Sequence, residues 1–181
     1  PSRRAWAILI SGRGSNLAAI LELGDAVDVR VVVSSQAGAG GLAKARRAGV
    51  ATTLLPKIAG TKKTDWPELT RQLRQRGVTH IFLAGFMKIV PKEFVAQWHE
   101  RIVNLHPSLL PNFPGLNSIE RAHADGGDVG VSIHLVDEGV DTGRILFQRR
   151  TVSAAEVPRL SLALTETLVH VDEQRMVRKF F

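Results

Sequence analysis

The fold is decided by residues 5–34, AWAILISGRGSNLAAILELGDAVDVRVVVS. Two short apolar, β-branched runs at 5–10 and 28–34 flank a glycine-rich turn and a stretch with helical spacing from about Ser15 to Leu23. A strand, a helix and a second strand in this order predict a β-α-β unit, in which the two strands are parallel and the crossover is right-handed.

The same alternation continues to about residue 105. We expect further helices over residues 42–49, 66–77 and 91–98, and further strands over 51–55, 79–85 and 101–105. Beyond residue 125, residues 130–137 and 144–152 predict an antiparallel hairpin, and residues 159–178 predict a last helix. The sequence therefore predicts a single α/β domain over residues 1–181: a Rossmann-like, mostly parallel twisted sheet with helices on both faces and an antiparallel hairpin in its C-terminal part.

Composition excludes several classes of protein. The chain has no Cys, which excludes disulfide and thiolate chemistry. Its longest apolar run, residues 81–87, is too short to span a bilayer, and no secretory signal is evident. We therefore expect a cytoplasmic protein without a membrane partner. The sequence leaves open whether it is a monomer or a homodimer.

The formal charge of +7 raises the question of an anionic partner. Tyr is absent, and the few aromatic residues do not interleave with the basic groups as a stacking platform for nucleic acid requires. Most basic groups have the spacing of solvated helix faces. The charge therefore favours a small anionic substrate over nucleic acid.

A glycine-rich turn, Ser11-Gly12-Arg13-Gly14-Ser15-Asn16, joins the first strand to the first helix. Free backbone N–H groups and the helix dipole favour an anion at such a place. The dinucleotide pattern fails because Leu17 stands at its third glycine, and the P-loop pattern fails because no Gly-Lys-Ser/Thr follows. We therefore expect Gly14, Ser15 and Asn16 to bind a terminal monophosphate; a purely structural helix cap by Ser15 is the alternative.

Two polar residues end a buried strand in the stretch RIVNLHPSLLP, residues 101–111. Asn104 and His106 share a face because strand side chains alternate. An amide donor beside an imidazole is suited to stabilising an oxyanion while a proton moves. Asp141, in a turn rich in glycine, is the natural acidic partner of the imidazole. A polar pair that only supports the loop, and an ordinary turn aspartate, remain the structural alternatives.

The other histidines and the acidic residues do not form a further site by their spacing alone. No set of His, Asp and Glu has the spacing of a metal site, so we expect no metal. Five further histidines lie within strand or helix patterns and are interpreted as structural residues: His80, His99, His123, His134 and His170.

Four segments together resemble the phosphoribosylglycinamide (glycinamide ribonucleotide) formyltransferases, which use 10-formyltetrahydrofolate. These segments are LISGRGSNLAAI (9–20), FLAGFMKIV (82–90), NLHPSLLPNFPG (104–115) and SIHLVDEGVDTGRIL (132–146). The resemblance runs through nearly the whole chain, and the combination of NLHPSLLP with HxVDxxxDTG is specific.

The resemblance implies a role for each of these segments. Asn104, His106 and Asp141 match the catalytic trio of the family. Residues that match its substrate site are Gly14, Ser15, Asn16, Pro107 and Glu173. Residues that match its folate site are Met87, Lys88, Ile89, Val90, Val136, Asp137, Glu138, Val140 and Asp141. The family also suggests a cis peptide before Pro111 and a reaction that needs no metal.

The expected reaction is a direct formyl transfer. The amine of glycinamide ribonucleotide attacks the formyl carbon of 10-formyltetrahydrofolate, Asn104 and protonated His106 donate hydrogen bonds to the oxyanion, and Asp141 supports the imidazolium. Formyltetrahydrofolate deformylase is the nearest alternative, although water as acceptor needs no phosphate loop. Methionyl-tRNA formyltransferase is a less favoured alternative, because it would need a further domain that binds tRNA. A basic nucleotide- or RNA-binding module is also less favoured, because such a module would not need Asn104, His106 and Asp141 together.

Overall fold

The computed structural model describes residues 4–181, which form two compact units. The first unit runs to Ile102 and includes Phe181, and the second is Val103–Phe180. The prediction that residues 1–181 form a single domain remains a prediction. Among residues 4–181, no helix combines the length and the apolar character needed to cross a membrane.

The first unit holds four parallel strands in the order β3-β2-β1-β4. Their bounds are Ala5–Ile10 for β1, Asp28–Ser34 for β2, Thr52–Leu54 for β3 and His80–Leu83 for β4. Every residue of β1 is buried, because β2 and β4 flank it on both edges. The order reverses between β1 and β4, as in a doubly wound fold.

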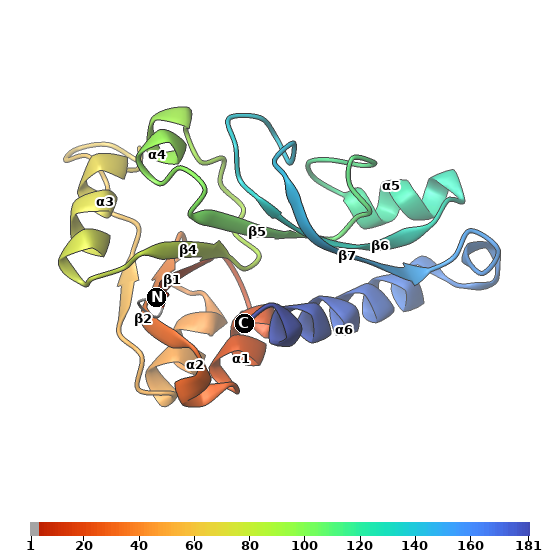
Figure 1. The fold of residues 1–181 in the computed structure, drawn as a ribbon, viewed down its shortest axis with the longest axis horizontal. Helices are drawn as coiled ribbons and strands as arrows, with labels where there is room; N and C mark the ends of the chain where they lie inside the picture. The colour runs from red at the N-terminus through yellow and green to blue at the C-terminus, as the bar shows by residue number, and fades with distance from the viewer. Residues whose placement is uncertain (1–3) are drawn as a thin grey trace. The chain divides into compact units, whose positions relative to one another are not determined.

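Three α-helices and a short 3₁₀ turn connect these strands, and a fourth helix follows β4. They are α1 (Ser15–Leu21), η1 (Gly24–Ala26), α2 (Gly40–Arg47), α3 (Trp66–Gln75) and α4 (Lys92–Gln97). Because the strand order reverses after β3, right-handed crossovers put α1 and α2 on one face and α3 on the other. Figure 1 shows α1 and α2 lying side by side, and the two helices pack together.

The second unit is built on an antiparallel sheet. It consists of β5 (Ile102–His106), of which all but the first residue belong to this unit, β6 (Val129–Leu135) and β7 (Ile145–Val152). The helix α6 (Leu162–Phe180) packs along β6 and β7, and α5 (Ser118–Asp125) packs on α6 and β6 (Figure 1).

The structure confirms the predicted fold class and corrects details. The helix α5 is absent from the sequence prediction. The last helix begins at Leu162 rather than at residue 159, because Pro158 lies in a separate 3₁₀ turn, η2 (Val157–Arg159). β1 and β2 have the predicted bounds. The first helix ends at Leu21, two residues earlier than predicted.

Candidate functional site

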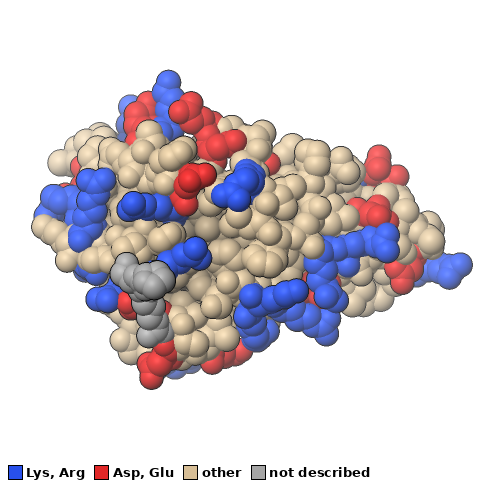
Figure 2. Space-filling view, viewed as in Figure 1, with Lys and Arg blue, Asp and Glu red and all other residues tan. Residues whose placement is uncertain are grey.

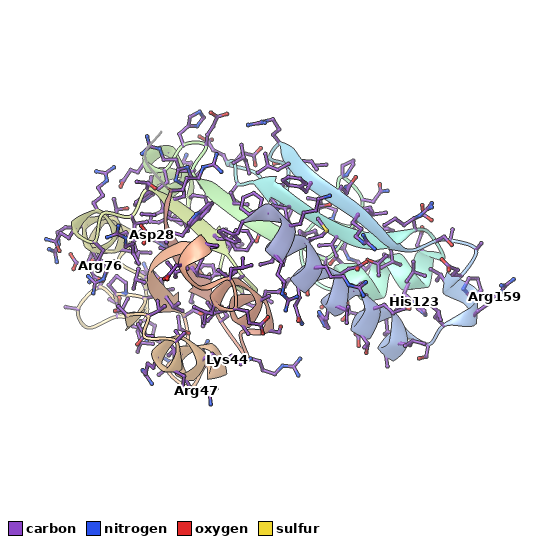
Figure 3. All side chains as sticks on the ribbon, turned by 60° about the horizontal axis from the view of Figure 1, so that its bottom comes forward. Asp28, Lys44, Arg47, Arg76, His123 and Arg159 are labelled. Carbon is purple, nitrogen blue, oxygen red and sulfur yellow. The ribbon has the colours of Figure 1, made fainter. Side chains whose placement is uncertain are left out.

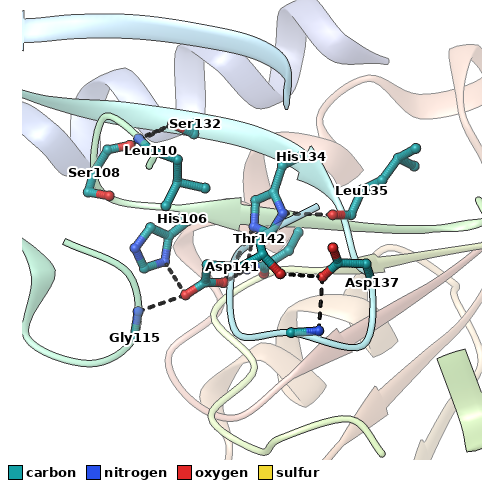
Figure 4. A network of polar contacts seen from close by, with 12 residues as sticks. His106, Ser108, Leu110, Gly115, Ser132, His134, Leu135, Asp137, Asp141 and Thr142 are labelled. Carbon is teal, nitrogen blue, oxygen red and sulfur yellow. Dashed lines mark hydrogen bonds and ion pairs between the residues drawn. The ribbon is translucent and has the colours of Figure 1, made fainter. Parts of the chain in front are cut away.

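Asp141 is the centre of a polar network in the second unit (Figure 4). Its Oδ1 accepts a hydrogen bond from Asn104 Nδ2 at 3.2 Å, and its Oδ2 accepts one from the Gly115 backbone N–H at 2.8 Å. His106 Nδ1 lies 3.4 Å from Oδ2, and His134 Nε2 lies 3.4 Å from Oδ1. The structure therefore brings the predicted trio together on one carboxylate.

The register of β5 and β6 explains this convergence. Asn104 pairs with His134 and His106 pairs with Ser132 across the two antiparallel strands. Because side chains alternate along each strand, all four side chains point to the same face. Asn104 Nδ2 also lies 3.2 Å from His134 Nε2. The imidazole of His134 thus belongs to the network, although its sequence pattern suggests a structural residue.

The turn that carries Asp141 is held by its own side chains. Asp137 Oδ1 accepts hydrogen bonds from the Gly139 N–H at 3.1 Å and from Thr142 Oγ1 at 2.7 Å. A Cβ added to Gly139 would overlap Thr142 Oγ1, so a larger residue here would displace the Thr142 hydroxyl from Asp137. Asp141 itself has a positive φ of 56°. The turn therefore presents the Asp141 carboxylate in one defined orientation.

The Asp141 carboxyl is ionised at neutral pH. Burial raises its pKa, but the contacts with His134 and with the Gly115 N–H outweigh burial, and His106 adds to their effect. The net result lowers the pKa of Asp141 to about 2. A permanent negative charge therefore lies between the two imidazoles.

The surroundings of His106 decide its resting protonation state. The side chain is buried, and this burial lowers the pKa of His106; the Phe113 carbonyl and Asp141 oppose the lowering, whereas His134 and Arg121 add to it. The ring is therefore neutral at rest near pH 7. His106 Nε2 lies 3.0 Å from the Phe113 carbonyl oxygen. Nδ1 faces the Asp141 carboxylate and Nε2 faces the Phe113 carbonyl, so both nitrogens face acceptors. If the ring gains a second proton, the charge of Asp141 therefore stabilises the imidazolium.

The loop that follows β5 is fixed to β6 and β7. Ser132 Oγ accepts from the Leu110 N–H at 3.1 Å and donates to the Ser108 carbonyl at 2.6 Å. Gln148 Nε2 donates to the Leu110 carbonyl at 2.7 Å and to Ser132 Oγ at 3.0 Å. The Leu110–Pro111 peptide is cis, which confirms the implication of the resemblance.

A second segment, residues 113–115, supplies the backbone groups that contact His106 and Asp141. Phe113 has a positive φ of 53°. The Arg121 guanidinium, from α5, lies 5.9 Å from the centroid of the Phe113 ring and donates to the Pro114 carbonyl. Arg121 thus holds this segment against the polar network.

The glycine loop of the first unit depends on close backbone packing. Gly14 has a φ of 70°, and a Cβ added to it would lie 2.7 Å from Gly41 Cα. The Gly12 carbonyl accepts from the Gly41 N–H at 3.2 Å, and Lys44 Nζ donates to the Gly14 carbonyl at 3.3 Å. The loop is therefore packed against the start of α2, and a cation of α2 reaches it.

The polar groups at the start of α1 include one side-chain oxygen without a partner among the described residues. The N-cap residue is Gly14, and no side chain caps the helix, so Ser15 does not act as the structural cap. Asn16 is only 7% exposed, and among the described residues its Oδ1 has no hydrogen-bond partner. A buried carbonyl oxygen without a partner would be satisfied by a hydrogen-bond donor of a bound ligand.

The residues expected at the folate differ in exposure. Met87 is 70% exposed and Ile89 is 83% exposed, which is unusual for large apolar side chains in a segment that follows a buried strand. In the second unit, Val140 is also exposed, whereas Val136 is half-buried. Exposed apolar groups of this kind fit a surface that a planar ligand covers.

Glu173 lies on the buried face of α6. Its Oε2 lies 2.8 Å from His170 Nδ1, so its carboxylate is paired with a residue of the same helix. Within residues 4–181, no group of three or more His, Cys, Asp or Glu side chains could hold a metal ion.

The basic residues lie mainly on solvated surfaces. Figure 2 shows Lys and Arg interspersed with Asp and Glu over the visible face, and Figure 3 shows Lys44 and Arg47 on α2. Several arginines are paired with carboxylates: Arg30 with Asp28, Arg71 with Glu68, Arg149 with Asp172, and Arg150 with Asp128. Part of the positive charge is therefore neutralised locally.

A family model described as formyl transferase matches residues 4–175. The trifunctional purine biosynthetic protein adenosine-3 of Drosophila pseudoobscura pseudoobscura is 41% identical over 155 residues, which make up 81% of this chain and 11% of that protein. The chain thus spans only a small part of this relative. The phosphoribosylglycinamide formyltransferase of Escherichia coli (strain K12) is 38% identical over 149 residues, covering 79% of this chain and 70% of that protein.

The fold is shared with solved structures. A phosphoribosylglycinamide formyltransferase from Anaplasma phagocytophilum superposes with a TM-score of 0.87 at 33% sequence identity, over 98% of this chain and 85% of that chain. The corresponding enzyme from Coxiella burnetii, solved in complex with CHES, has a TM-score of 0.84 at 34% identity, over 99% of this chain and 87% of that chain.

Proposed function

Because the chain belongs to the formyl transferase family, we propose that it transfers the formyl group of 10-formyltetrahydrofolate to the amine of glycinamide ribonucleotide. The products are N-formylglycinamide ribonucleotide and tetrahydrofolate, as in de novo purine biosynthesis. The observation that carries the proposal is the convergence of Asn104, His106 and His134 on the ionised carboxylate of Asp141. The names of the relatives support the choice of amine.

The first step forms a C–N bond between the amine and the formyl carbon. The formyl oxygen becomes an oxyanion, and the Asn104 amide and the His106 Nε2–H donate hydrogen bonds to it. His106 can do so only when the oxyanion replaces the Phe113 carbonyl at Nε2, because that carbonyl lies 3.0 Å from Nε2 in the structure. Loss of one such donor typically raises the barrier by about 3–4 kcal/mol.

The second step breaks the bond between the formyl carbon and the folate N10. The amine nitrogen loses a proton, and N10 gains one, so a proton has to be carried between them. Asp141 helps to relay this proton from the amine to N10 through water, and its charge stabilises the His106 imidazolium that donates to the oxyanion. His134 holds the other oxygen of Asp141 and keeps the carboxylate turned toward His106.

Binding of the substrates is assigned to several segments. Gly14, Ser15 and Asn16 bind the phosphate of glycinamide ribonucleotide, which the close packing of the glycine loop supports. Pro107 borders the same substrate. Glu173 contacts its ribose, for which the carboxylate has to share or leave its contact with His170.

The folate is assigned to two segments, 87–90 and 136–141. Their backbone groups hold the pterin, and the exposed side chains of Met87, Ile89 and Val140 cover it. The Asp141 carboxylate belongs to the second segment and also to the catalytic trio. No metal takes part in this scheme.

The test is the release of tetrahydrofolate from 10-formyltetrahydrofolate, followed with and without glycinamide ribonucleotide. Release that requires the amine supports the proposed transferase. Equal release without the amine would instead identify a deformylase, in which water is the acceptor. If no release occurs under either condition, the chain is a binding module and the proposal is wrong.

A further inference from the structure

Ser11 joins the ends of two neighbouring strands in the first unit. It follows Ile10, the last residue of β1, and its backbone N–H donates to the Gly85 carbonyl at 3.1 Å, beyond the end of β4. Its Oγ accepts from the Met87 N–H at 2.8 Å and lies 2.7 Å from Ser35 Oγ. Because β1 and β4 are adjacent and parallel, Ser11 stands where the strand order reverses, which is where open α/β sheets bind ligands.

These contacts restrain the segment that leaves β4. Residues 85–88 belong to no helix or strand, and Gly85 has a positive φ of 69°. Ser11 holds this segment at two points, the Gly85 carbonyl and the Met87 amide, and its side chain provides the second. With both points held, the backbone direction at Met87 and Lys88 is fixed relative to β1.

The hydroxyl of Ser11 can satisfy both of its neighbours. It has one donor hydrogen and two acceptor lone pairs, so it accepts from the Met87 amide and still bonds to Ser35 Oγ. Ser35 is itself tied to β1, since its N–H donates to the Ile10 carbonyl at 3.0 Å. Ser35 therefore orients the Ser11 hydroxyl, and the Ser11 hydroxyl accepts from the Met87 amide.

We propose that Ser11 is a positioning residue for the folate: its hydroxyl holds the Met87 amide so that the backbone of residues 87–90 keeps the conformation that binds the pterin. This rests on the proposed function, in which residues 87–90 form part of the folate site. The place of Ser11 in the sequence, beside Gly12 in the glycine loop, would assign it to the phosphate. Its hydrogen bonds assign it to the other ligand.

The discriminating experiment is the steady-state kinetics of Ser11→Ala with both substrates varied. One hydrogen bond is lost on the folate side, so we expect KM for 10-formyltetrahydrofolate to rise about 3–10-fold. KM for glycinamide ribonucleotide should change less than about twofold, because the backbone of the glycine loop keeps its packing against Gly41. Equal rises in both KM values would indicate a general disturbance of the loop and would overturn the proposal.

Two further variants separate the Met87 contact from the rest of the hydroxyl network. Ser35→Ala removes the neighbouring hydroxyl but leaves the bond to Met87, so both KM values should stay near those of the wild type. Ser11→Thr keeps the acceptor and should restore the folate KM. If Ser35→Ala raises the folate KM as much as Ser11→Ala does, the Met87 bond is not the cause and the proposal is wrong.

A binding measurement covers the case in which the proposed reaction itself is wrong. Calorimetric titration with tetrahydrofolate alone should show weaker binding to Ser11→Ala by a similar factor, at an unchanged thermal unfolding midpoint. If the wild type turns over and Ser11→Ala binds and uses folate normally, only the role of Ser11 fails. If the wild type binds no tetrahydrofolate, the proposed role of Ser11 is wrong. If the wild type binds tetrahydrofolate but does not turn over, only the proposed transferase function is wrong.

Discussion

The polar network around Asp141 and the glycine loop around Gly14 are built on opposite principles. The network depends on polar groups that are present: two imidazoles, a side-chain amide and a backbone N–H all contact the Asp141 carboxylate. In the glycine loop, the absence of side chains matters, because Gly14 packs directly against Gly41. The first arrangement is damaged by removing atoms, and the second by adding them.

The largest effect should come from removing members of the network. His106→Ala and Asp141→Asn should each lower kcat by about 10²–10⁴-fold, because an acid–base group or the charge that supports it is lost. The measurement is single-turnover formyl transfer, with circular dichroism to confirm folding. The exposed His99→Ala serves as the control and should keep normal turnover. Near-normal rates for both network variants would exclude the network as the catalytic centre.

Adding one carbon atom to the glycine loop tests the other half of the comparison. Gly14→Ala should lower the free energy of unfolding by about 1–3 kcal/mol, because its positive φ is unfavourable for Ala and its Cβ would press on Gly41 Cα. Gly12→Ala is the matched control, since a Cβ at Gly12 meets nothing within 4 Å. Chemical denaturation of both variants measures the difference, and equal losses would contradict the packing argument.

A smaller effect should follow from loosening the loop after β5. Gln148→Leu removes the donor to the Leu110 carbonyl, and we expect a loss of about 1 kcal/mol in the free energy of unfolding. Gln148→Glu keeps the size of the side chain but places an acceptor against that carbonyl, so it should destabilise more than Gln148→Leu. Urea denaturation decides the order, and the reverse order would show that packing outweighs the hydrogen bond.

The smallest effects should be shifts in the titration of His106. The charge of Asp141 raises the pKa of His106, so Asp141→Asn should lower that pKa further below its usual value of 6.5. The charge of Arg121 lowers the pKa of His106, so Arg121→Gln should raise it. NMR titration of the His106 ring measures both, and shifts in the same direction would refute this electrostatic account.

The sequence predicts the regular elements well where hydrophobic pattern and punctuation agree. β1 and β2 have the predicted bounds, and α3 begins at Trp66 as predicted, after Asp65 caps it by accepting from the Glu68 N–H. The sequence does not predict the helix α5, because its buried apolar face consists of Ile119 and Ala122 alone. Its start also lacks a side-chain cap.

The trio is predictable from residue type and position, but its protonation and its fourth member are not. His134 joins the network because β5 and β6 pair in one register, and that register is set between segments about thirty residues apart. The neutral resting state of His106 follows from burial, which depends on packing from several elements. Likewise, the partner of Glu173 becomes visible only when α6 brings His170 beside it.

The amide of Gly115, which donates to Asp141, is a natural probe of motion in the segment 113–115. While that bond is made, the amide proton is protected from exchange with solvent deuterium, and each opening of the segment exposes it. The same opening frees Nε2 of His106 from the Phe113 carbonyl. The hydrogen-exchange rate of the Gly115 amide therefore reports how often the His106 imidazole becomes available to a substrate.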